Sequence, residues 1–283
     1  MSTFIRHLAL VSESEAAPLA DVMRVAAALQ KQASRDIAPA WEVSATVDAF
    51  ARLEDVPTDY WPMIIKDNIG YAHAAGIHLD QQGQPFALIS ATDDIDGWSL
   101  TASHETAEML VDPFGNRVIA GDSIMPGQGR VNYLVEVADP SEAARFGYSV
   151  NGVLVSDFYT PRYFDPFKAA GVRYSFTGAI TKPRQVLEGG YLSWHDPVGD
   201  HWWQQTWFGA KPAFVDLGVL TGQGALRTKV DQATEGRLRA GARGRASASL
   251  AGMPARADDS GPARASQLRE QIQGLLAARP QTE

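Results

Sequence analysis

Residues 103–116, SHETAEMLVDPFGN, contain one histidine and two glutamates at a spacing that favours metal binding by a helix. His104 and Glu108 are four residues apart, so on an α-helix they lie on the same face, about 6 Å from each other. Zinc accepts imidazole nitrogen and carboxylate oxygen, and catalytic zinc sites combine three protein ligands with a water molecule. Glu105, next to His104, is then the candidate general base that takes a proton from that water.

Glutamate stands here where the HExxH pattern of zinc peptidases has its second histidine. A second carboxylate lowers the strength of the ion as a Lewis acid and suits metals that prefer oxygen, so Mn²⁺ is an alternative to Zn²⁺. The competing interpretation is a solvated acidic turn near a helix N-terminus, where the helix dipole favours glutamate. Spacing alone favours this second interpretation, because helix surfaces are rich in glutamate.

The third ligand has two candidates further along the chain. Glu136 is preferred, because it is a single acid inside the apolar run NYLVEVAD, where an unpaired carboxylate is costly. Asp157 ends the apolar run GVLVSD and is the alternative ligand; a salt bridge or a turn cap would also explain either acid. Asp112 is eight residues after His104, about 12 Å along the helix, which is too far for the same ion. It is expected to cap the helix or to contact a ligand.

A peptidase also needs a donor that stabilises the oxyanion. Tyr159 is the candidate for this catalytic role, although tyrosines and histidines of this kind are more often packed aromatics or surface residues. The alternatives are Tyr148, Tyr163, Tyr174 and His195. His73 and His78 are expected to be structural or to face solvent. The run WHDPVGDHWWQQTWF is expected to pack in a core, with a peptide or carbohydrate groove as the alternative.

The segments before the motif predict the elements that would position it. FIRHLALVS, WEVSATVDAF and WPMIIKDNI have strand patterns, and apolar residues at helical spacing from Leu19 to Leu29 predict a helix after the first of them. IHLD and FALISA flank a QQGQ turn and predict a hairpin. The motif helix is expected over residues 99–112, with Ser99 as N-cap and Asp112-Pro113 as its end. This order predicts an α+β fold.

Composition divides the chain of 283 residues into three parts. Residues 1–117 are expected to form the mixed sheet and the motif helix, and residues 118–228 a loop- and β-rich second subdomain that supplies the third ligand. Residues 229–283 are rich in Ala, Arg and Gly and predict a flexible tail. Its segment SQLREQIQGLLAAR has helical spacing, which fits a short docking helix or a frayed end.

Charge and composition exclude several functional classes. The net charge is −8, which argues against non-specific nucleic-acid binding, and the chain contains no cysteine, so thiolate catalysis and Cys-ligated zinc are excluded. G-x-S-x-G, Walker A and G-x-G-x-x-G motifs are missing. The sequence offers no secretion signal or membrane span, so a cytoplasmic location without membrane contact is expected, and export without a classical signal would leave no trace. The oligomeric state is not indicated.

The segment GQPFALISATDDIDGWSLTASHETAEMLVDP resembles bacterial zincin-like proteins whose helix reads SHExxEMxxDP. With the order of elements, this similarity to zincin metallopeptidases covers about residues 1–165. In that fold the active-site helix follows an edge strand that aligns the substrate backbone. The resemblance implies ligands at His104 and Glu108, a base at Glu105 and, as in gluzincins, a downstream glutamate as third ligand.

The resemblance also implies a function, a zinc-dependent peptidase or peptidase-like hydrolase with a peptide or protein substrate. The chain departs from the family at Glu108, and it lacks the glycine and third histidine of metzincins. The first alternative is a catalytically inactive zincin-fold module for binding or assembly, related to phage or secretion. The second is an unrelated α+β domain whose aromatic-rich half binds a carbohydrate.

Overall fold

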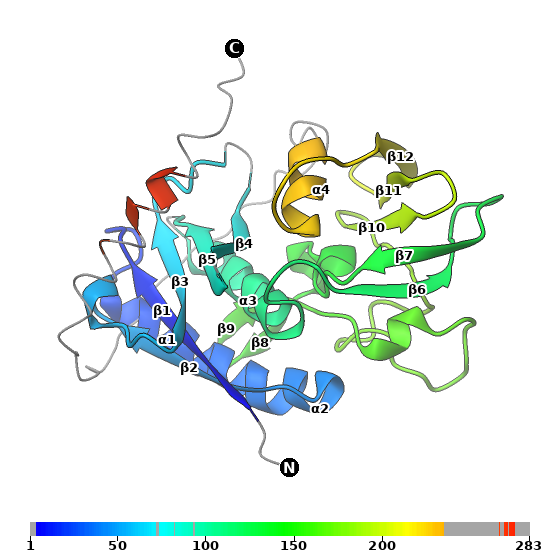
Figure 1. Ribbon diagram of the computed structural model, residues 1–283. Coiled ribbons are helices and arrows are strands. Elements are labelled where there is room, and N and C mark those ends of the chain that lie inside the picture. The colour runs from blue at the N-terminus through cyan, green and yellow to red at the C-terminus, as the bar shows by residue number, and fades with distance from the viewer. Residues whose placement is uncertain are drawn as a thin grey trace.

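The computed structural model describes residues 4–71, 74–81, 83–92, 94–234, 266, 269–270 and 272–274. It has a mixed α+β fold with two five-stranded sheets (Figure 1). The expected fold class is therefore confirmed at this level. His73 and most of the tail after residue 234 lie outside the described residues.

The first sheet runs in the order β2-β1-β3-β5-β4. Its strands are β1 (Ile5–Ser12), β2 (Ser44–Phe50), β3 (Tyr60–Lys66), β4 (Gly76–Gln81) and β5 (Gln84–Ser90). All neighbours are parallel except β4, which pairs with β5 in antiparallel orientation. Within the described part of the chain β4 is the last strand of this sheet, so one of its edges has no neighbouring strand.

The two faces of this sheet belong to different apolar clusters, because side chains alternate along each strand. Ala87 of β5 packs on the helix side, whereas Leu88 packs on the opposite side. Ile77 and Leu79 of β4 share the cluster of Leu88. His78 lies between them and pairs with Ala87, so its side chain points to the helix side.

Two helical segments cover the helix side of the first sheet. Helix α1 (Leu19–Gln32) continues through a π-helical turn at Ala33–Ile37 into α2 (Ala38–Trp41). Helix α3 (Ile95–Val111) follows β5 and is buried around most of its circumference. Polar residues on such a helix need partners inside the protein, because water cannot satisfy them.

The second sheet is antiparallel and runs in the order β12-β11-β10-β7-β6. Its strands are β6 (Val118–Asp122), β7 (Arg130–Leu134), β10 (Tyr191–Asp196), β11 (His201–Thr206) and β12 (Ala213–Gly218). A hairpin of β8 (Tyr148–Val150) and β9 (Val153–Val155) packs against α1 and α3, and helix α4 (Leu226–Thr234) follows β12. In Figure 1, α3 is seen between the two sheets.

One apolar cluster extends from the helix side of the first sheet to the second sheet. It includes Leu10 and Met63 of the first sheet, Met109 of α3, and Tyr133 and Trp194 of the second sheet. The expected boundary between residues 117 and 118 therefore separates two sheets that share one core. This shared core brings the loops that follow β7 against α3.

The structure corrects two of the expected boundaries. Helix α3 begins at Ile95 with Asp94 at the N-cap position, not at Ser99. Ser99 lies inside the helix, where its hydroxyl donates a hydrogen bond to the carbonyl of Leu154 at 2.8 Å. Helix α4 continues to Thr234 and crosses the expected start of the tail at residue 229.

The described residues of the C-terminal segment contact the first sheet. Residues 269, 270 and 272–274 are helical, and Ile272 is buried in the cluster on the sheet's opposite side. Arg269 forms ion pairs with Glu13 at 2.8 Å and Glu54 at 2.7 Å. These contacts favour the docking helix over the frayed end. No helix in the described ranges has the length and apolar character needed to cross a membrane.

Gly190 fixes the distance between β10 and the 3₁₀ turn Asp139–Ser141. A Cβ at Gly190 would lie 2.5 Å from the carbonyl oxygen of Asp139 and 2.7 Å from that of Pro140. We expect Gly190→Ala to lower the free energy of unfolding by about 1–3 kcal/mol, the usual cost of overpacking, measured by urea denaturation. Gly209→Ala is the control, since a Cβ there has no neighbour within 4 Å. Equal stability of the two variants would contradict this packing.

Candidate metal centre

Helix α3 presents His104 and Glu108 on one face, as the spacing predicts. The Nε2 atom of His104 lies 3.3 Å from Oε1 of Glu108. The Glu108 side chain is fully buried, whereas the side chain of His104 keeps 12% of its surface exposed. The pair is therefore inside the protein with one edge open to solvent, and the interpretation as a solvated acidic turn is wrong.

Asp139 completes a group of three with this pair. Its Oδ1 lies 3.2 Å from Nε2 of His104, and the ligand atoms of His104, Glu108 and Asp139 all lie within 4.8 Å of one another. Asp139 is 1% exposed; His104 is the partner of its Oδ1, and its Oδ2 has no hydrogen-bond partner within the described residues. A buried carboxylate oxygen without a partner is costly, so binding of a cation or a proton would stabilise Asp139.

The segment that follows β7 positions Asp139. The backbone N–H of Ala138 donates to Oε1 of Glu108 at 3.3 Å, and the N–H of Tyr159 donates to the carbonyl of Val137 at 2.7 Å. The segment is therefore fixed between α3 and the strand-like residues around Tyr159. Asp139 follows directly and starts a 3₁₀ turn.

A second group of three lies on the other side of Glu108. The Nδ1 atom of His78 is 3.3 Å from Oε2 of Glu105 and 3.6 Å from Oε2 of Glu108. Its Nε2 lies 3.2 Å from the carbonyl oxygen of Asp112 and can donate to it. Both ring nitrogens of His78 therefore face acceptor oxygens of the protein.

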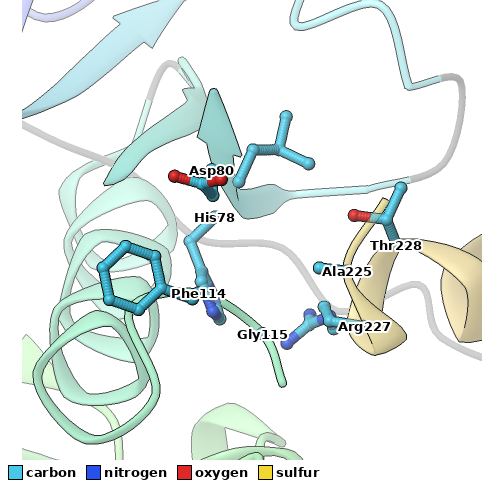
Figure 2. A pocket seen from close by; sticks show the side chains of 8 residues that line it. His78, Asp80, Phe114, Gly115, Ala225, Arg227 and Thr228 are labelled. Atoms are coloured by element: carbon cyan, nitrogen blue, oxygen red, sulfur yellow. The ribbon is translucent and has the colours of Figure 1, made fainter. Parts of the chain in front are cut away.

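Glu136 does not join either group of three. Its Oε2 forms an ion pair with Nη1 of Arg227, and the same Nη1 donates to Oε2 of Glu108 at 2.7 Å. The Nε atom of Arg227 pairs with Asp231 at 3.0 Å. In Figure 2, Arg227 of α4 and His78 of β4 lie around one small hollow with Gly115. We call the four buried carboxylates Glu105, Glu108, Glu136 and Asp139 the acid cluster.

Burial and the nearby charged groups shift the pKa values of Glu108, Glu136 and Asp139 in different directions. Burial opposes the charged form of Glu108, but His104 and Arg227 outweigh this and hold its pKa below the usual value. For Asp139, burial and then the charge of Glu108 raise the pKa, and burial also raises the pKa of Glu136 well above its usual value. The pKa of His104 is raised as well, because Glu108 and Asp139 outweigh its desolvation.

Glu142 is a half-buried carboxylate close to this centre. Burial, followed by the charge of Asp139, raises its pKa to about 8, and the charge of His104 acts in the opposite direction. A carboxyl group with this pKa can exchange a proton near neutral pH. Glu142 is thus a candidate acid–base group that the sequence did not single out.

The other predicted site residues have separate surroundings. Oδ1 of Asp157 accepts a hydrogen bond from the N–H of Thr177 at 2.9 Å, and Asp157 belongs to neither group of three. Asp112 follows the end of α3, where its Oδ2 accepts the N–H of Arg117 at 2.6 Å. This agrees with the expected capping role of Asp112.

Tyr159 is fully buried, and within the described part its hydroxyl has no hydrogen-bond partner. Burial, then Tyr163, then the charges of Glu136, Glu108 and Asp139 raise its pKa, so Tyr159 lies within electrostatic range of the acid cluster. Tyr163 stacks on it, with ring centroids 4.2 Å apart.

The remaining tyrosine and histidine candidates have partners elsewhere: Tyr148 bonds Asp36, Tyr174 bonds the N–H of Ala169, and His195 pairs with Asp200.

Three residues of this centre were missed by the sequence analysis. Asp139 stands three residues after Glu136 in NYLVEVADP, and the end of the apolar run at Asp-Pro was a usable signal. His78 was expected to be structural or to face solvent, because the sequence does not say which face of β4 the helix covers. Arg227 has no local signal, since it meets Glu108 across 119 residues of chain.

Two of the three distances between ligand atoms of the first group are close to those around a tetrahedral zinc ion. Ligand atoms about 2.0–2.2 Å from such an ion lie about 3.3–3.6 Å from one another. His104 Nε2 lies 3.3 Å from Glu108 Oε1 and 3.2 Å from Asp139 Oδ1, close to this range. The donor set of one imidazole and two carboxylates suits Zn²⁺ or Mn²⁺. No family model, curated protein or solved structure matches the chain.

The raised pKa values predict that stability falls as pH rises. A carboxyl group whose pKa is higher in the folded chain keeps a proton that the unfolded chain has lost, so for Glu142 stability falls between its usual 4.5 and about 8. The raised pKa of His104 also makes stability fall as pH rises above about 6.5, the usual pKa of histidine. We expect the metal-free protein to lose unfolding free energy from pH 5 to pH 8, by up to about 1.4 kcal/mol per pH unit for each proton.

Urea denaturation at constant ionic strength measures this slope. Glu142→Gln removes one of the titrating groups and should flatten the slope. A slope that is the same in both proteins would contradict the raised pKa of Glu142.

Proposed function

We propose that this protein is a metal-dependent hydrolase of zincin-like architecture that cleaves peptide bonds. The observation that supports this best is the buried carboxylate of Asp139, whose Oδ1 faces His104 at 3.2 Å beside Glu108 and whose Oδ2 has no hydrogen-bond partner within the described residues. These three residues would hold Zn²⁺, or Mn²⁺ as the alternative. In this proposal Asp139 takes the place that the sequence analysis gave to Glu136.

The arrangement of elements supports the zincin-like proposal. In the first sheet three parallel pairs are followed by an antiparallel edge strand, β4, and α3 lies against the face to which His78 points. The edge of β4 that lacks a neighbouring strand would bind an extended substrate by backbone hydrogen bonds. The peptide bond to be cleaved would then lie along β4, the strand next to Glu105.

The proposed chemistry is attack by water on the peptide carbonyl. The metal would polarise that carbonyl and lower the pKa of the attacking water. An oxygen of Glu105 would take the proton from water as the C–O bond forms and pass it to the amine as the C–N bond breaks. Glu105, which contacts His78 at 3.3 Å on the other side of Glu108, would have to turn toward the ion for this step, and Tyr159 is the proposed donor to the oxyanion.

A second function, a non-catalytic module stabilised by the metal, is favoured by the burial of the centre. The hollow between β4 and α4 is too small to hold a water molecule, whereas ligand pockets usually have volumes of several hundred Å³. The acid cluster is at most 4% exposed on its side chains. Glu105 itself is buried, with 3% of its side chain exposed.

Metal content tests the proposed ligands. We expect purified protein loaded with Zn²⁺ or Mn²⁺ to retain one ion per chain after dialysis, measured by elemental analysis. His104→Ala and Asp139→Asn should lose the ion, because two remaining protein ligands rarely hold zinc. Asp157→Asn is the matched control, since Asp157 is also a buried carboxylate but lies outside both groups. Retention of metal by Asp139→Asn, or its loss from Asp157→Asn, would contradict the assignment.

Peptide hydrolysis separates the two functions. We expect Glu105→Gln to keep the metal and to lower the hydrolysis rate about 10²–10⁴-fold, the usual contribution of a general base. Glu142→Gln is the comparison, and a loss confined to that variant would identify Glu142 as the base instead. Wild-type protein that holds metal but cleaves no peptide in a mixed peptide library would support the non-catalytic module.

A further inference from the structure

The N-terminal turn of α4 is fixed on the loop that follows α3. The backbone N–H of Arg227 donates to the carbonyl of Gly115 at 2.9 Å, and the N–H of Leu226 donates to Oδ1 of Asn116 at 3.0 Å. Gly115 has a φ of +59°, and a Cβ there would lie 2.8 Å from the Cβ of Arg227. This close approach places the guanidinium of Arg227 at a defined position beside α3 (Figure 2).

The contacts of Arg227 divide the two oxygens of Glu108 between different partners. Nη1 of Arg227 donates to Oε2 at 2.7 Å. Oε1 accepts the N–H of Ala138 at 3.3 Å and faces His104. Because each oxygen has its own donor, rotation of the Glu108 carboxylate is restricted, and Oε1 stays on the side of Asp139.

The same guanidinium pairs with Glu136, which would otherwise be an unpaired buried carboxylate. An acid without a partner at this position would compete for a cation beside Glu108. Pairing with Arg227 holds Oε2 of Glu136 on the side of α4, whereas its Oε1 has no hydrogen-bond partner within the described residues. Hydrogen bonds to ligand carboxylates of this kind tune metal sites, and their loss typically weakens metal binding about 10–100-fold.

We propose that Arg227 is a positioning residue for the metal centre: it holds Glu108 so that Oε1 faces His104 and Asp139, and it keeps Glu136 from acting as a ligand. This inference rests on the proposed function, because it assumes that His104, Glu108 and Asp139 bind the ion. It adds that metal affinity depends on the docking of α4, an element far from α3 in the sequence. Arg227 itself contacts neither metal nor substrate.

Co²⁺ is the probe, because its visible absorption reports coordination as well as binding. The full chain is titrated with Co²⁺ alone, and the dissociation constant, stoichiometry and absorption band are recorded after circular dichroism has verified folding. We expect wild type to bind one Co²⁺ per chain and Arg227→Met to bind it about 10–100-fold more weakly with an altered band. Arg227→Lys keeps the charge but not the planar fork, and should recover only part of the affinity.

Two further variants make the result specific. Glu136→Gln should keep the stoichiometry and band of wild type, because Glu136 is not a ligand in this proposal. Arg269→Met is the matched control, since Arg269 also pairs with two carboxylates, Glu13 and Glu54, on another part of the surface. It should leave Co²⁺ binding unchanged.

The possible failures can be told apart. Unchanged or tighter binding by folded Arg227→Met would overturn this inference but leave the proposed function standing, since His104, Glu108 and Asp139 would still hold the ion. If Arg227→Met does not fold, wild-type affinity in Arg227→Lys, or loss of the band in Glu136→Gln, would overturn it in the same way. Wild-type protein that is folded but binds no Co²⁺, Zn²⁺ or Mn²⁺ would remove both.

Discussion

The burial of four carboxylates around α3 is the constraint on which the rest of the structure depends. Each buried carboxylate loses its hydration, and the low-dielectric interior makes every unpaired charge expensive. Within the described chain, Arg227 is the only Arg or Lys that forms an ion pair with this cluster; the imidazoles of His78 and His104 are its other partners. The elements that supply these groups are therefore held together electrostatically as well as by apolar packing.

This constraint explains why α3 is covered from several directions. Strand β4 brings His78 to one side of Glu108, the segment after β7 brings Ala138 and Asp139 to another, and α4 brings Arg227 to a third. None of these contacts is local in sequence. The shared apolar core of the two sheets makes them compatible, because it fixes both sheets against the same helix.

Local patterns were sufficient to predict the first sheet and the motif pair. The apolar runs gave β1, β3 and the β4–β5 hairpin, and i,i+4 spacing gave the contact of His104 with Glu108. The same local patterns predicted that α3 starts at Ser99, because a serine before an apolar run is typical of an N-cap. In the structure the Ser99 hydroxyl donates instead to the carbonyl of Leu154, 55 residues away in the chain. Glu136 was predicted to be a ligand because it is a lone acid in an apolar run. A buried acid of this kind can equally pair with an arginine. Contacts between distant segments, such as Glu136 with Arg227, leave no spacing pattern to detect.

The position of Arg227 in the chain also sets an order of assembly during synthesis. Ribosomes deliver the chain from its N-terminus, so Glu108, Glu136 and Asp139 have all emerged before the guanidinium that pairs with two of them. Until then Glu108 and Glu136 lack their arginine partner, and His104 is the one group described above that pairs with Glu108 and Asp139 and has already been synthesised. Burial of α3 with ionised acids is therefore less favourable before residue 227 has been synthesised than after it. A nascent chain that stops short of this residue exposes an apolar helix with unpaired acids, the kind of surface that chaperones bind.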